Sequence, residues 1–161
     1  MKKILLIIVL FVLLGFIGFI IFRKDKNILF EPETMTVQVF FNNNLLDPEY
    51  SCYKVFSVER EIVRTQGVAR AALEQLLQGP SQEEKDQGFY TSLNQGVIIQ
   101  SLSVVDGIAR VDFNDQLEFQ VGGSCLVSAI RAQITETLKQ FSTVREVVIS
   151  INGRVEDILQ P

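Results

Sequence analysis

The hydrophobic pattern begins with an unbroken apolar run over residues 4–22, ILLIIVLFVLLGFIGFIIF, which holds 19 residues without a charge or an amide. At about 1.5 Å of rise per helical residue, this run is just long enough to cross the ~30 Å hydrocarbon core of a bilayer. It is longer than the apolar region of a cleaved signal peptide, and no small-residue cleavage site follows it. The pattern therefore predicts a transmembrane anchor with its flanks over residues 1–26, in contact with the lipid bilayer through residues 4–22.

The charges on the two sides of this run are nearly balanced. Lys2 and Lys3 precede it, and Arg23, Lys24 and Lys26 follow it. The positive-inside rule therefore does not settle the orientation, and a simple count even favours a cytoplasmic C-terminus. A short N-terminal anchor preceded by a lysine pair is the usual arrangement of a tethered exported domain. We therefore expect a single-pass protein of the cytoplasmic membrane whose C-terminal domain is extracytoplasmic.

After a linker over residues 27–35, the pattern changes to short segments of alternating polar and apolar residues. Alternation and β-branched residues predict strands. Asp106-Gly107 between two of these runs predicts a tight hairpin. A near-continuous apolar run at the end predicts a buried central strand. The predicted strands cover residues 36–41, 54–63, 97–105, 108–113 and 146–151.

Two longer segments have the spacing of amphipathic helices. The first begins after Thr65 as its cap and ends at Gly79-Pro80. The second begins with Ser124 as its cap and ends at Phe141. Between them, Ser81 and Glu84 fit a capping box, which predicts a short helical turn over residues 82–87. The apolar stripe of the second helix consists of Leu126, Ile130, Ile134, Leu138 and Phe141.

The order of these elements is β-(β)-α-β-β-α-β, where the second strand is the least regular. This order predicts an α+β domain over residues 36–161. The strands and helices could form two split crossover units, or a sandwich with both helices on one face of a sheet.

The net charge of the chain limits which classes of molecule it can bind. The chain has 15 basic and 19 acidic residues, and residues 1–26 hold 5 basic and 1 acidic of these. The remaining 10 basic and 18 acidic residues give the rest of the chain a net charge of −8. Such a domain repels phosphate backbones, which excludes nucleic acid as a partner. The chain also has no histidine, so the commonest general base and zinc ligand is missing.

Three stretches together resemble a known family. They are AALEQLLQGPSQEEKDQG, VDGIARVDFN and AIRAQITETLKQFSTVREVVISINGR. Four motifs in these stretches resemble the GerM domain, also called the sporulation and spore germination domain. They are the helix end L-L-x-G-P, the D-G hairpin with V-D-F, the helix end T-L-x-x-F, and the strand and turn V-x-I-x-I-N-G. The resemblance covers roughly Thr36 to Leu159. All of these motifs belong to packing and turns, and none is a catalytic signature.

The resemblance implies a compact fold similar to the ring-building modules of bacterial envelope assemblies. Members of the family are usually anchored to a membrane or lipid outside the cytoplasm. This chain has one such domain where some members have two, and it has no lipid-attachment cysteine after the apolar run. Many members occur in bacteria that never sporulate, so a link to sporulation is left open.

The two cysteines are Cys52 and Cys125, and both belong to the predicted exported domain. An even number of cysteines in an oxidising compartment favours a disulfide between them. We then expect Gly122 and Gly123 to allow close approach of the two backbones. Two alternatives stay open. In the first, a helix N-terminus lowers the pKa of the Cys125 thiol and makes it reactive. In the second, the cysteines bind zinc, but the chain has neither a C-x-x-C motif nor a histidine to complete such a site.

Two polar groups are candidates for other sites. The carboxylates of Asp106, Asp112, Asp115 and Glu118 could hold calcium, although their spacing is not that of an EF-hand. The second helix carries Arg131, Gln133, Glu136 and Lys139, which form either a solvated face or a face that docks to a neighbouring module.

Together these observations predict a non-catalytic extracytoplasmic domain, without a cofactor, that binds or positions a cell-envelope protein or a cell-wall polymer. Self-association into a homo-oligomer stays open. One rival hypothesis is a small thiol-active or hydrolytic envelope enzyme. The other is an exported domain that binds calcium or another ligand.

Overall fold

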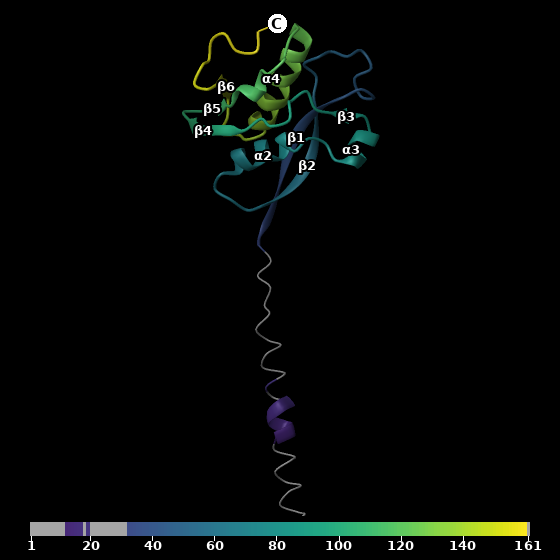
Figure 1. The fold of residues 1–161 in the computed structure, drawn as a ribbon, viewed down its shortest axis with the longest axis vertical. Helices are drawn as coiled ribbons and strands as arrows, with labels where there is room; N and C mark the ends of the chain where they lie inside the picture. The colour runs from purple at the N-terminus through teal and green to yellow at the C-terminus, as the bar shows by residue number, and fades with distance from the viewer. Residues whose placement is uncertain (1–11, 18, 20–31, 161) are drawn as a thin grey trace, which may run out of the picture. The chain divides into compact units, whose positions relative to one another are not determined.

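The computed structural model describes residues 12–17, 19 and 32–160 (Figure 1). Residues 12–17 are helical, and Glu33–Pro161 form one compact unit. Among the described residues, none of the helices has both the length and the hydropathy needed to cross a membrane. Most of the predicted membrane-spanning run, residues 4–22, lies outside the described residues.

The first sheet has three antiparallel strands in the order β2-β1-β3. Its long central strand, β1 (Thr34–Asn43), pairs with β2 (Phe56–Val63) along the whole length of β2. At its C-terminal end β1 also pairs with the two-residue strand β3 (Phe89–Tyr90). The sequence pattern predicted β1 and β2 but predicted a loop at β3.

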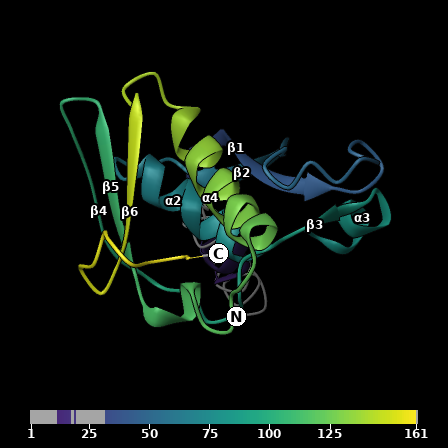
Figure 2. The ribbon, with the colours of Figure 1, turned by 90° about the horizontal axis from the view of Figure 1, so that it is seen from above.

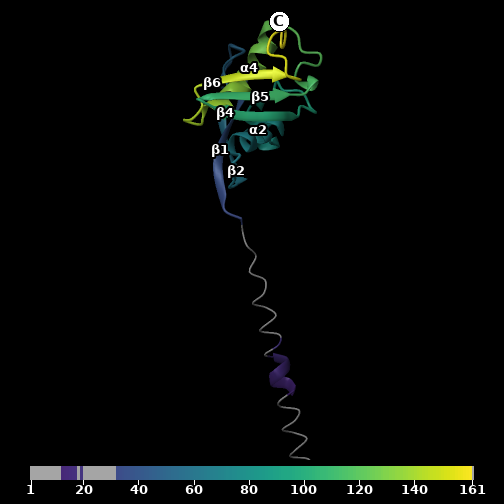
Figure 3. The same ribbon diagram turned by 90° about the vertical axis from the view of Figure 1, so that its left-hand side faces the viewer.

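The second sheet has the strand order β4-β5-β6, and Figure 3 shows its three strands side by side. The hairpin joins β4 (Ile99–Val105) to β5 (Ile108–Phe113), and both hairpin residues, Asp106-Gly107, have positive φ as predicted. β6 (Glu146–Ile151) runs parallel to β5. The prediction of β6 as a central strand was wrong, because β5 lies between its two neighbours and β6 is at the edge. The apolar run of β6 reflects one buried face and a second face that is only partly covered.

Two helices lie between the sheets (Figure 2). α2 (Val68–Leu77) and α4 (Ser124–Lys139) pack against each other and against β1. α4 also contacts β6, and α2 contacts β4. The α+β class is therefore confirmed, but the predicted strands divide over two separate sheets, one on each side of the helices. Neither a single helix-covered sheet nor a pair of crossover units describes this arrangement.

The core is formed where the helices meet the two sheets. Phe41 of β1 and Phe113 of β5 are fully buried, and they pack in one cluster with the stripe of α4. Ile130, Ile134 and Leu138 of that stripe are fully buried, as the helical spacing predicted. Burying each such side chain contributes about 1.5–3 kcal/mol to the free energy of unfolding.

The helix ends follow the predictions in part. α3 (Gln82–Asp86) has the predicted capping box between Ser81 and Glu84. The predicted side-chain caps at Thr65 and Ser124 were wrong. α2 follows Gly67 and α4 follows Gly123, and neither cap residue has a side chain to bond the helix. Ser124 already lies within the helix, so its hydroxyl is past the cap position.

The capping carboxylate of α3 also joins this helix to the first sheet. Both guanidinium nitrogens of Arg60, on β2, donate to the carboxylate of Glu84, one of them at 2.6 Å. The pKa of Glu84 is lowered, first by the hydrogen bond from Arg60 and also by the backbone N–H of Ser81, against the opposing effect of burial. The ion pair with Arg60 therefore stabilises the charged form of Glu84, and protonation of this carboxylate removes the ion pair.

Candidate functional site

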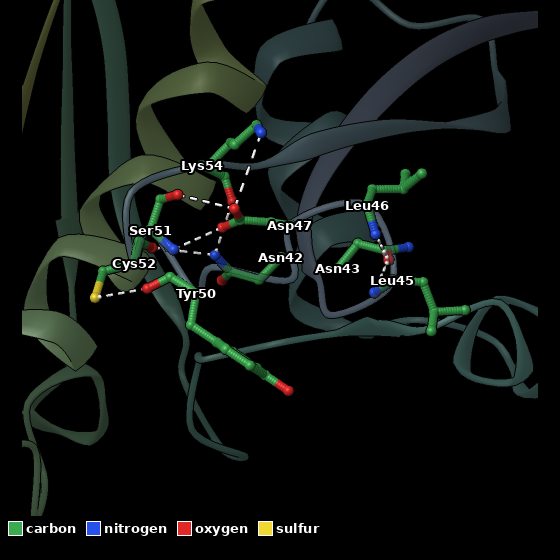
Figure 4. Close-up of polar contacts among 9 residues, drawn as sticks. All are labelled: Asn42, Asn43, Leu45, Leu46, Asp47, Tyr50, Ser51, Cys52 and Lys54. Carbon is green, nitrogen blue, oxygen red and sulfur yellow. Dashed lines mark hydrogen bonds and ion pairs between the residues drawn. The ribbon is translucent and has the colours of Figure 1, made fainter.

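The loop between β1 and β2 is held in shape by its own polar side chains (Figure 4). The side-chain oxygen of Asn43 accepts hydrogen bonds from the backbone N–H groups of Leu45 at 2.8 Å and Leu46 at 2.9 Å. The carboxylate of Asp47 accepts from the backbone N–H of Ser51 at 2.7 Å and from its hydroxyl at 2.8 Å. Asn43 and Asp47 are themselves buried. The loop is therefore ordered rather than free, and its shape is defined before any partner binds.

A buried polar network attaches this loop to the rest of the domain. The amide nitrogen of Asn42 donates to the carbonyls of Cys52 at 3.1 Å and Lys54 at 3.0 Å. The amide nitrogen of Gln133, on α4, donates to the side-chain oxygen of Asn42 at 2.7 Å. The hydroxyl of Thr91 donates to Gln133 at 3.0 Å. This network joins the loop, β1, the segment after β3 and α4, so that they are positioned as one unit.

The predicted docking residues of α4 do not form one surface. Gln133 is fully buried in the network, so its predicted docking role was wrong. The Gln133 side chain bonds to Asn42 of β1 and to Thr91 after β3, which explains why a polar residue occurs on the buried side of the helix. Arg131 is exposed and donates to the carbonyl of Ile158 at 3.1 Å, so it holds the C-terminal segment. Glu136 and Lys139 are exposed, and docking by them stays a prediction.

The loop and the start of α4 meet at the two cysteines. The Cα atoms of Cys52 and Cys125 are 5.0 Å apart, and their sulfurs meet in a disulfide-compatible arrangement. A sulfur bonded in this way has no hydrogen, so the 3.5 Å approach of the Cys52 sulfur to the Tyr50 carbonyl is a contact and not a hydrogen bond. The β1–β2 loop and the start of α4 are therefore held together at this point.

The two glycines before α4 have a different role from the one predicted. A Cβ atom on Gly122 or Gly123 would meet no atom within 4 Å, so neither glycine is needed for close backbone approach. Gly123 has φ +85°, a conformation that favours glycine, at the residue that caps the helix. The open space beside both glycines is part of a pocket.

This pocket has a volume of about 350 Å³ and lies beside the cysteine pair. One wall comes from Tyr50 of the β1–β2 loop and from Tyr90 and Ser92 of the β3 segment. The opposite wall comes from the start of α4, with Leu126 and Ala129. We call it the tyrosine pocket. It combines aromatic and aliphatic surface with hydroxyl groups, as small binding sites do.

All three tyrosines of the chain belong to this region. Tyr50 and Tyr90 line the pocket, and Tyr53 follows Cys52 in the loop. Their exposed fractions are 63% for Tyr50, 72% for Tyr53 and 41% for Tyr90. The pKa of Tyr90 is raised, first by burial and then by the nearby carboxylate of Asp47 and by Tyr50. The Tyr90 hydroxyl therefore keeps its proton at neutral pH and can donate a hydrogen bond.

The loop also exposes two leucines. Leu45 is 67% exposed and Leu46 is 53% exposed, although both have their backbone N–H groups bound by Asn43. Large apolar side chains held in solvent by an ordered backbone cost solvation free energy. Together with the tyrosines they make the loop a surface suited to contact with another molecule.

The four predicted calcium ligands are used within the fold or stay separate. The carboxylate of Asp112 accepts from the hydroxyl of Ser150 at 2.6 Å and from the backbone N–H of Gly153 at 2.9 Å. Glu118 pairs with Arg154. Within the part of the chain that the structure describes, no group of three or more histidine, cysteine, aspartate or glutamate side chains could hold a metal ion. The structure therefore does not bring Asp106, Asp112, Asp115 and Glu118 together as a calcium site.

Sequence reasoning missed the tyrosine pocket, because residues 42–53 lie between two predicted strands and received no functional interpretation beyond Cys52. The signal was present in the sequence. Turn-forming asparagines, aspartate and proline precede two tyrosines on either side of a cysteine, in the stretch NNNLLDPEYSCY. The third tyrosine is distant in sequence, and only the pairing of β1 with β3 brings it to the same place.

By its fold, the chain is a small mixed α+β domain in which two sheets enclose two helices, with a pocket beside the start of α4. The chain belongs to the sporulation and spore germination family, because the family model Germane matches residues 38–157. The predicted family resemblance is therefore confirmed. No curated protein matches the chain.

The GerMN domains of a Bacillus subtilis protein show the same fold at low sequence identity. The first GerMN domain of the sporulation protein GerM from Bacillus subtilis is 22% identical, with a TM-score of 0.59, over 75% of this chain and 85% of that chain. The tandem GerMN domains of the same protein are 20% identical, also with a TM-score of 0.59, over 76% of this chain. The match spans 41% of that tandem chain. A putative lipoprotein from Clostridium perfringens is 14% identical with a TM-score of 0.48.

Proposed function

We propose that this protein is a membrane-anchored, extracytoplasmic and non-catalytic domain that binds a cell-envelope protein through the tyrosine pocket and its loop. The observation that carries the proposal is the set of exposed tyrosines and leucines on a loop whose backbone is already ordered. Tyrosine contributes a large contact area at a low cost in conformational entropy, and it is frequent at the centres of protein interfaces. Because the loop is held by buried hydrogen bonds, binding does not have to order it again.

Binding fits this site better than catalysis. The described residues that line the pocket supply hydroxyl groups, backbone and apolar surface, and Cys125 lies at bonding distance from Cys52. A cysteine in a disulfide has no free thiolate, so it cannot attack a substrate. The protonated Tyr90 hydroxyl can donate a hydrogen bond at neutral pH but is a poor base. These features favour recognition of a partner surface.

A protein is favoured as the partner over a cell-wall polymer. A glycan is recognised by aromatic rings together with polar side chains, whereas aliphatic side chains gain little from contact with it. This loop exposes Leu45 and Leu46 as well as Tyr50 and Tyr53. Burying those leucines against an apolar partner surface would gain about 25 cal/mol for each Å² removed from water.

The location outside the cytoplasm rests on two features of the chain. The apolar run over residues 4–22 has the length and hydropathy of a membrane anchor. A disulfide between Cys52 and Cys125 would persist in an oxidising compartment and not in the cytoplasm. Membership of the sporulation and spore germination family is consistent with work in the cell envelope.

Photo-crosslinking of the full-length protein in its native cells tests the proposal. A photoreactive amino acid at Tyr53 should form an adduct with one protein, and Tyr50→Ala in the same chain should reduce that adduct strongly. The matched control places the same photoreactive group at Val63, which is 57% exposed and pairs with Thr34 at the other end of β1.

Two results would contradict the proposal. Equal adducts from both positions, or none from position 53, would remove the pocket as the binding surface. Adducts with glycan fragments and not with a protein would show that the partner is a cell-wall polymer.

A further inference from the structure

The two cysteines are part of the wall of the tyrosine pocket. Cys52 belongs to the loop side with Tyr50, and Cys125 belongs to the start of α4 on the opposite side. The hydrogen bonds of residues 50–53 stay within the loop or go to Asn42 of β1, and within the described chain none of them reaches α4. A disulfide between Cys52 and Cys125 is therefore the direct link between the loop wall and the helix wall.

The backbone on the loop side adopts a conformation that needs support from its surroundings. Tyr50 has φ +50° and Cys52 has φ +58°, so two residues out of three are in the left-handed region. Residues with side chains rarely adopt this region, and they keep it only where the surrounding structure holds them there. The carboxylate of Asp47 holds Ser51, which lies between them, and the bond to Cys125 holds Cys52. Breaking that bond removes one of these two constraints and lets the backbone return to ordinary negative φ values.

This link lies where a reductant can reach it. Cys125 is exposed and Cys52 is half-buried. Gly122 and Gly123 line the same pocket, and a Cβ atom on either of them would meet no atom within 4 Å, so the pocket is open on the side of Cys125. Exposed disulfides are more easily reduced than buried ones, and they include the labile and regulatory ones. The position of this bond therefore favours its reversible reduction in the folded protein.

We infer that the bond between Cys52 and Cys125 is a redox switch that opens and closes the tyrosine pocket, an inference that rests on the proposed binding function. With the bond closed, the loop wall that carries Tyr50 is held against α4 in the shape that binds the partner. With the bond open, residues 50–53 move away from α4, and the affinity for the partner falls. The base of the loop stays in place, because its hydrogen bonds to β1 and from β1 to α4 do not involve the sulfurs.

The reductant is a dithiol of the cell envelope. One of its thiols, as the thiolate, attacks the sulfur of the exposed Cys125, the protein disulfide breaks, and Cys52 leaves as a thiolate. The second thiol then attacks the mixed disulfide, which closes the reductant's own disulfide and releases Cys125. The two protons that the dithiol loses are taken up by the two cysteines. The protein disulfide is thereby reduced and the dithiol oxidised, and an oxidised dithiol reverses the reaction.

Amide hydrogen exchange of the full-length chain in a non-ionic detergent tests the switch without the partner. The amides of Ser51 and Tyr53 are hydrogen-bonded within the loop. After reduction with dithiothreitol they should exchange about tenfold faster or more, through a local opening that low concentrations of urea do not accelerate. The amides of β5 should exchange only through urea-dependent unfolding, because the core stays folded. The double variant Cys52→Ser with Cys125→Ser should behave like the reduced wild type and should not respond to dithiothreitol.

Photo-crosslinking from position 53 in native cells measures binding itself. At equal amounts of the full-length chain, the double cysteine variant should form much less of the adduct than the wild type. An equal adduct from the two proteins would overturn the inference.

The two readouts separate the switch from the proposed function. Loop amides that exchange no faster after reduction, or only together with those of β5, would overturn the switch and leave the binding function intact. If no adduct forms in either protein while the loop opens on reduction, the proposed function fails, and the opening and closing of the pocket is supported.

Discussion

The covalent link between Cys52 and Cys125 should be a major source of stability. The two residues are separated by 73 positions, so a bond between them closes a long loop in the unfolded chain. In the chain-entropy model, closing a loop of this length stabilises the folded state by up to about 4 kcal/mol. Cys125 is exposed and Cys52 is half-buried, so replacing either by alanine leaves little cavity. The loss of the crosslink should therefore exceed any loss of packing.

Three variants separate these two contributions. We expect Cys52→Ala, Cys125→Ala and the double variant to lose the same free energy of unfolding, because either single change already opens the loop. The measurement is urea unfolding without reductant, followed by circular dichroism, with the wild type under reductant as a fourth sample. If the two cysteines contributed only through packing, the single losses would add in the double variant.

The reasoning would be refuted by additive losses, or by wild-type protein whose unfolding midpoint does not change under reductant. A free-thiol titration of denatured, unreduced protein from the native cells gives an independent check. It should find no free thiol before reduction and two after it. Two free thiols before reduction would restore Cys125 as a candidate reactive site.

Three further predictions concern the elements that surround the site. Gln133→Leu removes the hydrogen bond that this side chain donates to Asn42 and the one that it accepts from Thr91, so it should lower the free energy of unfolding by about 1–3 kcal/mol and loosen the loop in hydrogen exchange. An unchanged loop would contradict this. Glu84→Gln should destabilise the domain at neutral pH by about 1–3 kcal/mol. The hydrogen bond from Arg60 lowers the pKa of Glu84 in the folded state. The carboxylate therefore contributes to the free energy of unfolding above the unfolded pKa, and this contribution is lost as the pH falls through the folded pKa. The free energies of unfolding of the variant and the wild type should therefore become equal in acid. Gly88→Ala should lower the melting temperature more than Gly153→Ala. Both glycines have positive φ, so alanine is strained at either position, but only at Gly88 would the new Cβ lie 2.5 Å from a neighbouring side chain.

Much of the local structure could be predicted from the sequence. The strands over 108–113 and 146–151 begin and end at the predicted residues, because alternation or a short apolar run ends at turn residues there. The capping box of Ser81 and the hairpin at Asp106-Gly107 were also confirmed, since each depends on residues that are close in the sequence. Local hydrogen bonds and φ preferences decide such features.

The candidate site could be predicted only in pieces. An even number of cysteines favoured a disulfide, and the structure places Cys52 and Cys125 close enough for one. The tyrosine pocket was missed, because it forms only where Tyr90 of β3 reaches the loop that contains Tyr50. Gln133 was assigned to the helix surface, but the helix pattern cannot show that its side chain meets a buried asparagine on β1.

The resemblance of its motifs indicated the family, and the sequence by itself determined the class of fold and most elements. These depend on periodicity, turn chemistry and composition, which act over a few residues or over the whole chain. The tertiary structure alone decided that the strands form two sheets around the helices and that β6 lies at the edge of the second sheet. These features depend on which distant surfaces pack together, and several arrangements of the same elements bury a similar apolar area.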